Sequence, residues 1–183
     1  MMRTAMRKMP ASLSRFAGCE RGLSAIEFAL VAPIMITTYF GAYEMCDILV
    51  ANRKVTSVAA ATTDLVAQAT QIANADMTNI FNAATAIMAP YNANVLEITV
   101  SSVNTDGAGT TKIAWSDALH TTARAPGTTY TLPTGLATPG GSVIMTEVKF
   151  TYATPIGTFV TNGITFTDKF YQRPRRVTVI PRV

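Results

Sequence analysis

The feature that most limits what this chain can fold into is an uninterrupted apolar run near its N-terminus. From Leu23 to Tyr43 the sequence has 21 residues and a single charged side chain, Glu27. An α-helix of this length rises about 30 Å, which is enough to cross the hydrocarbon core of a bilayer. A secretory signal would have a shorter apolar region followed by a small-residue cleavage site, whereas two acidic residues follow this run. We therefore predict a transmembrane helix over residues 23–43.

The charge of the chain is concentrated before this run. The formal net charge is +4, and residues 1–22 alone carry five basic side chains and one acidic side chain, 5 − 1 = +4. Basic residues that precede a membrane span favour the cytoplasmic side. The pattern therefore predicts a basic leader over 1–22, a cytoplasmic N-terminus and an exported C-terminal part.

Four arginines near the C-terminus form the other basic feature. Val and Pro residues alternate with them, which is typical of a strand with one solvated face. We interpret the segment as a basic edge strand and not as a nucleic-acid surface, so no nucleic acid is expected as a partner. The arginines are Arg173, Arg175, Arg176 and Arg182.

The helix is predicted to continue past the apolar run. Residues 44–90 read as an exported helical segment, because apolar residues recur at helical spacing and no proline lies between Ile34 and Pro90. This predicts a helix of about fifty residues with an amphipathic second half. Asp76 is expected to cap a second, short helix that ends near Ala89.

Residues 91–183 change to a period of two, which predicts an exported β domain. We expect a strand near 95–103, a turn at 104–109, a return strand at 112–115 and a loop over 116–141. Further strands are expected at 143–152, 164–172 and 177–180. The predicted fold class is α+β, with the long helix packed on a small antiparallel sheet.

Gly22 and Glu27 stand at a spacing that suggests a chemical role for both. Glu27 is the fifth residue after Gly22, and an unpaired carboxylate deep in a membrane costs about 3 kcal/mol or more. One interpretation is that Glu27 lies one turn into the helix and reaches back to the headgroups. The other is that a cut between Gly22 and Leu23 creates an α-ammonium on Leu23, which Glu27 of the same or a neighbouring subunit neutralises.

The same residues carry a resemblance to a known family. A basic leader ending in Gly22, a glutamate at the fifth following position and a helix that overlaps the junction resemble a type IV prepilin. The stretch from Gly22 to Pro33, with its Ala-Ile-Glu-Phe-Ala run, is closer to the TadE-like proteins of tight-adherence (Tad) pili. Pro-Gly-Gly-Ser at 139–142 and Gln-Arg-Pro-Arg at 172–175 are similar to the tail of these proteins, and the TadE and TadF subtypes both stay open.

This resemblance implies a minor pilin or pilin-like assembly protein that acts in adhesion. Prepilin peptidase would cleave between Gly22 and Leu23. The other implied partners are pilin and minor pilin subunits, the inner-membrane assembly platform and the lipid bilayer. The implied location is the inner membrane, with one span, a periplasmic C-terminal domain and incorporation into the fibre left open. The alternative is an unprocessed single-span protein whose exported domain binds a partner.

Pro33 and two cysteines complete the N-terminal features. Pro33 removes one backbone donor inside the predicted helix and crowds the carbonyl of Ala29, so we expect a kink. The tetrapeptide Phe-Ala-Gly-Cys at 16–19 resembles a lipobox, but basic residues precede it where a lipobox needs an apolar stretch. Cleavage after Gly22 would remove Cys19 and leave Cys46 alone. We interpret Cys46 as an inert helix-packing thiol in preference to a nucleophile or an intersubunit bridge.

The sequence shows no constellation typical of an active site, so we predict that the chain is not an enzyme and needs no metal or cofactor. His120, the one histidine, has no cysteine or acidic pair at ligand spacing. Asp106 and Asp117 could touch calcium, but they lack the acidic ladder of a calcium loop, so both are interpreted as turn-forming residues. Trp115 and the aromatic residues of the late strands are expected in the core.

Overall fold

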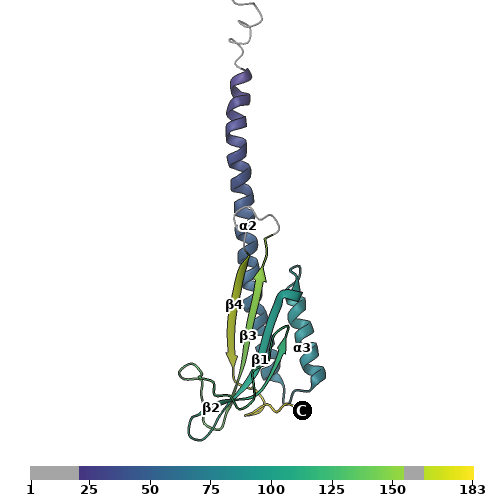
Figure 1. Cartoon of the computed structure of the whole chain (residues 1–183), viewed down its shortest axis with the longest axis vertical. Helices are drawn as coiled ribbons and strands as arrows, with labels where there is room; N and C mark the ends of the chain where they lie inside the picture. Colours follow the sequence, from purple (N-terminus) through teal and green to yellow (C-terminus); the bar gives the residue numbers. More distant parts are fainter. Residues whose placement is uncertain (1–20, 155–162) are drawn as a thin grey trace, which may run out of the picture. The chain divides into compact units, whose positions relative to one another are not determined.

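The computed structural model describes residues 21–154 and 163–183. Most of the predicted leader, including the lipobox-like residues, lies outside this description. The chain divides into two compact units, Met1–Tyr43 and Glu44–Val183. One helix, α2 (Arg21–Gln68), contributes residues to both units (Figure 1).

The described residues of the first unit are all helical. They form the first part of α2, which has 48 residues in total and continues past Pro33 without interruption. This confirms the prediction of one helix of about fifty residues. Within the unit, large apolar side chains are exposed, among them Leu23 (61%), Phe28 (72%) and Leu30 (68%).

The second unit is built on a four-stranded antiparallel sheet with the strand order β2-β1-β3-β4 (Figure 1). Its strands are β1 (Leu96–Thr105), β2 (Thr111–Leu119), β3 (Ser142–Tyr152) and β4 (Ile164–Gln172). The sheet follows a second helix, α3 (Asn74–Ile87), and a single 3₁₀ turn, η1 (Ala93–Val95). The predicted α+β class is therefore confirmed.

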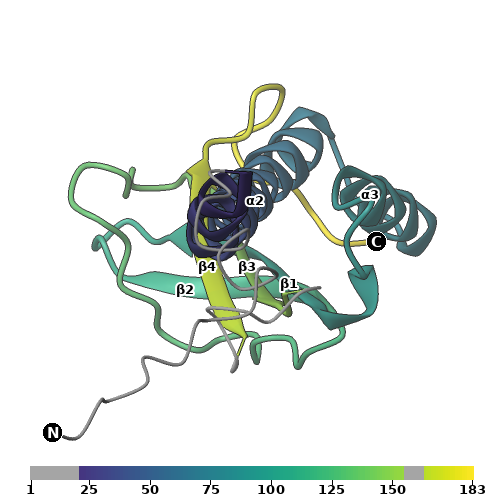
Figure 2. The same cartoon turned by 90° about the horizontal axis from the view of Figure 1, so that it is seen from above.

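The core of the second unit lies between one face of the sheet and the helices. Ile98 of β1 and Val148 of β3 are register partners, and both are buried against α2. Figure 2 shows α2 and α3 on the same side of the sheet. The part of α2 that enters this core presents small and β-branched side chains. These are Ala51, Val55, Val58, Ala59 and Val66.

Helix α3 is held at both ends by charged side chains. The Asp76 carboxylate accepts a hydrogen bond from the Ala73 backbone N–H at 2.9 Å, which satisfies a donor at the start of the helix. The Lys54 ammonium donates to the Ile87 carbonyl at 2.8 Å, where a cation also complements the helix dipole. The expected capping role of Asp76 is confirmed, although Asp76 occupies the third helical position and not the cap itself.

A long connection after β2 covers part of the opposite face of the sheet. Leu132 packs there with Val103, Ile113 and Val143 in a second, smaller apolar cluster. The connection is fastened by the Arg124 guanidinium, whose Nε donates to the Glu147 carboxylate at 2.9 Å. Glu147 also pairs with Lys169 of β4 at 2.6 Å.

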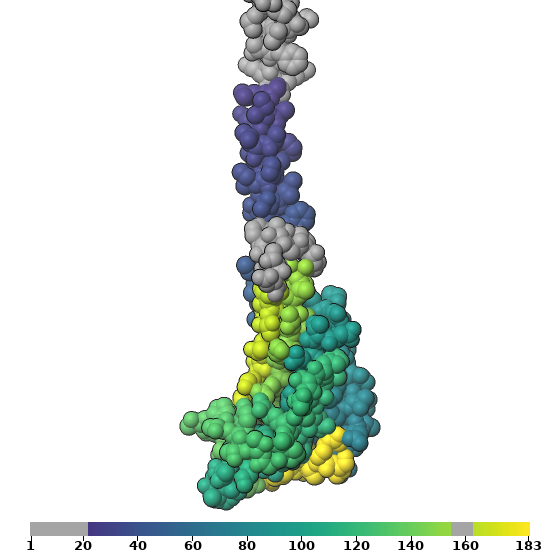
Figure 3. Space-filling model, viewed as in Figure 1, coloured from purple at the N-terminus to yellow at the C-terminus, as the bar shows by residue number. Residues whose placement is uncertain are grey.

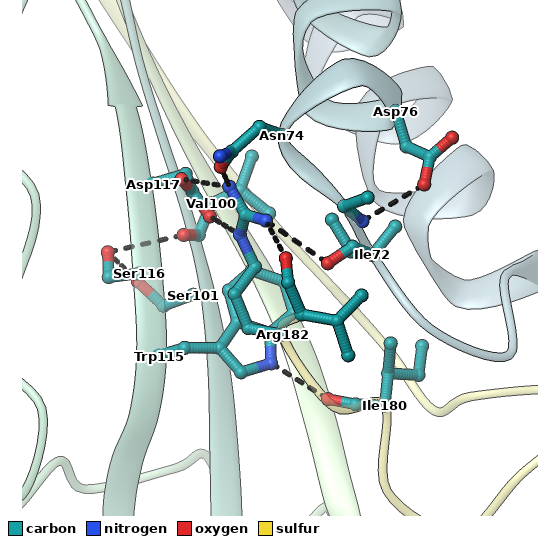
Figure 4. Close-up of polar contacts among 12 residues, drawn as sticks. Ile72, Asn74, Asp76, Val100, Ser101, Trp115, Ser116, Asp117, Ile180 and Arg182 are labelled. Carbon is teal, nitrogen blue, oxygen red and sulfur yellow. Dashed lines mark hydrogen bonds and ion pairs between the residues drawn. The ribbon is translucent and has the colours of Figure 1, made fainter.

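The C-terminal segment departs most from the prediction, because residues 177–180 do not form a strand. Their backbone groups bond to several different elements instead: the Thr178 carbonyl accepts from the Ser142 N–H, and the Trp115 indole N–H donates to the Ile180 carbonyl at 2.8 Å (Figure 4). A parallel bridge then joins Ile72 to Arg182. Figure 3 shows this last part of the chain on the surface beside the start of α3.

The four C-terminal arginines do not form a basic edge strand either. Arg175 pairs with Asp64, Arg173 donates to the carbonyls of Gly135 and Leu136, and Arg182 is held by Asp117. Each of these three therefore serves as an internal fastener of the second unit.

Two further expectations are corrected by the sheet. Strand β2 runs to Leu119, beyond the predicted end at 115, because residues 116–119 keep register with β1 although their composition is weak for a strand. Asp117 is consequently a strand residue and not a turn residue. Asp106 is the turn-forming aspartate that was predicted, since its carboxylate accepts from the N–H groups of Ala108 and Thr110.

Among the aromatic residues, Trp115, Phe150 and Tyr152 are buried as expected, at 7%, 2% and 2% exposure. Phe170 is 37% exposed and is not a core residue.

Candidate functional site

The first turns of α2 bring the predicted cleavage residues and the predicted carboxylate together. Gly22, Leu23 and Glu27 are all helical and exposed. Leu23 and Glu27 are four residues apart, so they lie on one face of the helix, one turn from each other. Side chains on a helix tilt toward its N-terminus, so the Glu27 carboxylate leans toward the backbone nitrogen of Leu23. Among the described residues it makes no hydrogen bond or ion pair.

Space around Gly22 is open. A β-carbon added there would meet no atom within 4 Å, and the residue has ordinary helical geometry. The glycine is therefore not required by packing or by backbone conformation in the described structure.

Within the first unit and after its first turn, α2 carries mainly apolar side chains all around the helix. Its most apolar window of 18 residues has a mean hydropathy of 1.6, and none of that window is buried. A helix that is apolar all round and uncovered by its own chain is typical of a membrane span. By length and composition, α2 can cross a membrane once.

Pro33 lies six residues after Glu27 and contacts neither cleavage residue. One turn further on, the Thr37 hydroxyl donates to the Pro33 carbonyl at 2.8 Å, and the Thr38 hydroxyl donates to the Ile34 carbonyl at 2.8 Å. The two hydroxyls are thus satisfied within the helix, as the apolar surroundings of a membrane require.

Comparison with known proteins identifies a family that the N-terminal part of the chain matches. Residues 22–64 match the family of TadE-like proteins. This part of the chain is TadE-like. The TadE-like segment starts at the predicted cleavage residue, contains Glu27 and Pro33, and ends within α2. It confirms the N-terminal part of the resemblance and supports the coarse assignment to pilin-like proteins associated with Tad pili. The similar tail segments at 139–142 and 172–175 lie outside the match. No curated protein and no solved structure matches the chain.

The TadE-like segment also includes an acidic site that sequence reasoning missed. Asp47 of α2 accepts a hydrogen bond from the Tyr91 hydroxyl at 2.7 Å on one carboxylate oxygen, and from the Tyr152 hydroxyl on the other. Glu44, one turn earlier, is only 3% exposed. Hydropathy alone cannot find this site, because Tyr91 and Tyr152 are distant in sequence.

The two tyrosines are themselves fixed by aromatic packing. The Tyr91 ring meets the Tyr152 ring edge to face, with the centroids 5.9 Å apart. Burial, the hydrogen bond to Asp47 and the nearby negative charges of Asp47 and Glu44 together raise the pKa of the Tyr152 phenol. Tyr152 therefore stays protonated and acts as a hydrogen-bond donor to Asp47.

The remaining candidates do not gather into a site. The thiol of Cys46 is exposed on α2. His120 directly follows the last residue of β2. It has a positive φ of 55°, and its Nδ1 lies 2.9 Å from the Leu96 carbonyl oxygen. Among the described residues, no group of three or more His, Cys, Asp or Glu side chains could hold a metal ion.

Proposed function

We propose that this chain is a minor pilin or pilin-like assembly protein of a Tad-type type IV pilus, with a role in adhesion and surface attachment. The observation that carries the proposal is the TadE-like match, which begins at Gly22 and includes the exposed apolar stretch 23–43 with its single acidic residue, Glu27. In the proposal, prepilin peptidase cuts between Gly22 and Leu23 and leaves α2 attached to the exported unit.

The proposed role of Glu27 follows from its place on the helix. Cleavage creates an α-ammonium on Leu23, one turn before the carboxylate. In the low dielectric of a membrane, the two opposite charges stabilise each other much more than they would in water. Glu27 would neutralise the ammonium of its own chain or of a neighbouring subunit, and this pairing would guide assembly.

The proposed location and partners follow from the basic leader and the apolar helix. The leader keeps the N-terminus in the cytoplasm, and α2 crosses the inner membrane once. Prepilin peptidase would meet the junction on the cytoplasmic face. Pilin and minor pilin subunits, together with the inner-membrane assembly platform, would contact the processed chain. We further propose that the exported unit acts by binding and not by catalysis.

The direct genetic test is Gly22→Ala in the full chain. We expect loss of processing and a large fall in the number of pili, because the alanine β-carbon occupies the cleavage position. Gly107→Ala is the matched control, since a β-carbon there also meets nothing within 4 Å. Immunoblots for processing and electron microscopy for pili read the result. Since α2 tolerates the added methyl group sterically, a defect specific to Gly22→Ala is not a folding defect.

The opposite outcome would favour an unprocessed single-span protein with an exported partner-binding domain. In that case the chain would keep its full length at steady state. The Gly22→Ala and Gly107→Ala variants would then both behave as wild type.

A further inference from the structure

Helix α2 has two chemically different sides just after Tyr43. One side points into the second unit and carries both acids of this stretch. Glu44 is 3% exposed, and the Asp47 carboxylate is half-buried and bonded by two tyrosine hydroxyls. These two acids follow the apolar run in the sequence. Both therefore face the interior of the second unit and not the outer surface of α2.

The other side of the same turns is apolar and uncovered. Met45 is 58% exposed, Leu49 55% and Val50 47%, and Cys46 is exposed beside them. At about 100° per residue, these four positions spread over about 140° of the helix surface. No charged side chain lies on this outward face before Arg53.

Arg53 ends the apolar face. Around the helix axis, at about 100° per residue, Arg53 lies near the middle of that face. Along the axis it lies about one turn beyond Leu49. It is exposed, and its guanidinium makes no hydrogen bond or ion pair with the described residues. An unpaired arginine at the edge of an apolar surface fits the level of lipid phosphates, where the stem stays in the apolar zone and the charge reaches the headgroups.

We propose that this outward face of α2, formed by Met45, Cys46, Leu49 and Val50, contacts lipid, with Arg53 at the headgroup level. The lipid-facing part of the helix then extends about two turns beyond Tyr43 on one side only. The opposite side stays polar because Tyr91 and Tyr152 hold Asp47 within the exported unit. The proposal rests on the membrane anchor of the proposed function.

Lipid explains this surface better than a second copy of the chain. A helix seam between two copies is a narrow stripe, whereas this face is broad. The isolated cation at its end also has no acidic counterpart on the outward face of these turns, because both acids there are turned inward. A bilayer supplies both the apolar zone and the anionic phosphates.

The test uses nitroxide labels on the full chain, reconstituted in vesicles of phosphatidylcholine and phosphatidylglycerol. Cys19→Ser leaves Cys46 as the single native labelling site. In a background that also lacks Cys46, Leu49→Cys tests the same face, Ser57→Cys tests the exposed helix beyond Arg53, and Leu30→Cys tests the anchor. Collision rates with oxygen, which enters lipid, and with a water-soluble nickel chelate are compared at each label.

We expect oxygen to dominate at positions 30, 46 and 49, and the nickel chelate to dominate at position 57. Water-like values at 46 and 49 with lipid-like values at 30 would overturn this inference and leave the anchor intact. Water-like values at position 30 would overturn the anchor and the inference together. Labels at 46 and 49 that are shielded from both reagents, and that broaden each other until diluted with unlabelled chain, would assign the face to a second copy and overturn the lipid contact.

Discussion

Two acids on α2, Glu27 and Asp47, show how surroundings decide what a carboxylate does. Asp47 receives two tyrosine hydroxyls and is fixed inside the second unit. Glu27 is exposed on an apolar helix and makes no polar contact with the described residues. A group left without a partner in apolar surroundings needs one from elsewhere, and the α-ammonium created by cleavage is the group that the proposal supplies.

We predict that Glu27→Gln leaves membrane insertion and processing intact but lowers the number of pili severalfold. The amide has nearly the same size as the carboxylate and cannot neutralise the Leu23 ammonium. Membrane fractionation checks insertion, and counting pili by electron microscopy checks assembly. Normal pilus numbers in this variant would sink the proposed pairing.

Glu147 is the most strongly embedded acid among the ion pairs of the second unit, with 17% of its side chain exposed. Burial alone would raise the pKa of its carboxyl. The hydrogen bonds and positive charges of Lys169 and Arg124 outweigh burial, so the pKa is lowered. A lowered pKa in the folded state means that Glu147 stabilises the fold above its ordinary pKa, and that this contribution is lost as the pH falls through the folded-state value.

We therefore predict that Glu147→Gln lowers the free energy of unfolding by about 1–2 kcal/mol at pH 7. The difference from wild type should begin to shrink as the pH falls below the ordinary carboxyl pKa of about 4. It should vanish below the lowered folded-state pKa, where wild type has lost the same charge. Glu97→Gln is the control: its pair with Lys149 is more exposed, and we expect at most about 0.5 kcal/mol. Thermal unfolding of the full chain in detergent, followed across pH, measures both. Equal effects of the two substitutions would contradict the assignment.

At the scale of elements, the sequence predicts what depends on local pattern. The length of α2 follows from the apolar run and the helical spacing after it, and β3 and β4 follow from alternation. The coarse site around Gly22 and Glu27 is also local, because it depends on spacing along one helix.

Features that depend on residues distant in the sequence are not predicted. Residues 177–180 alternate like a strand, but their backbone bonds go to Trp115 and Ser142. The burial of Asp47 depends on Tyr91 and Tyr152, which no periodicity connects to α2. Tertiary contacts determine the structure of residues 177–180 and the burial of Asp47, and the pattern of a single sequence does not reveal such contacts.

The C-terminal segment is the element whose anchoring can be tested most simply. Arg182 donates to Asp117 at 2.9 Å, to Asn74 at 2.6 Å and to the Ile72 carbonyl at 3.1 Å (Figure 4). Arg182→Ala would leave the half-buried Asp117 carboxylate without its cation. We predict a loss of about 2–3 kcal/mol in the free energy of unfolding.

Arg176→Ala is the matched control for this segment, because Arg176 is exposed and pairs with none of the described residues. Its effect should stay within about 0.5 kcal/mol. Trp115 is the chain's one tryptophan, and its indole bonds to the same segment, so its fluorescence reports the unfolding directly. A neutral Arg182→Ala would show that the segment is not held by this residue.

At the scale of the whole molecule, the chain joins a TadE-like apolar helix to an α+β unit. In the proposed function, the first supplies the membrane anchor and the cleavage junction between Gly22 and Leu23. The second supplies a folded surface with its own core and its own polar fasteners. Under the proposed function, the chain acts in pilus assembly. The central claim of the proposed function is processing between Gly22 and Leu23.

The intact mass of the membrane-extracted chain, from cells with and without prepilin peptidase, tests that claim most directly. The account predicts a species that begins at Leu23 when the peptidase is present and the full-length chain when it is absent. Full-length mass in both cells would contradict the account, because the chain would then be an unprocessed single-span protein.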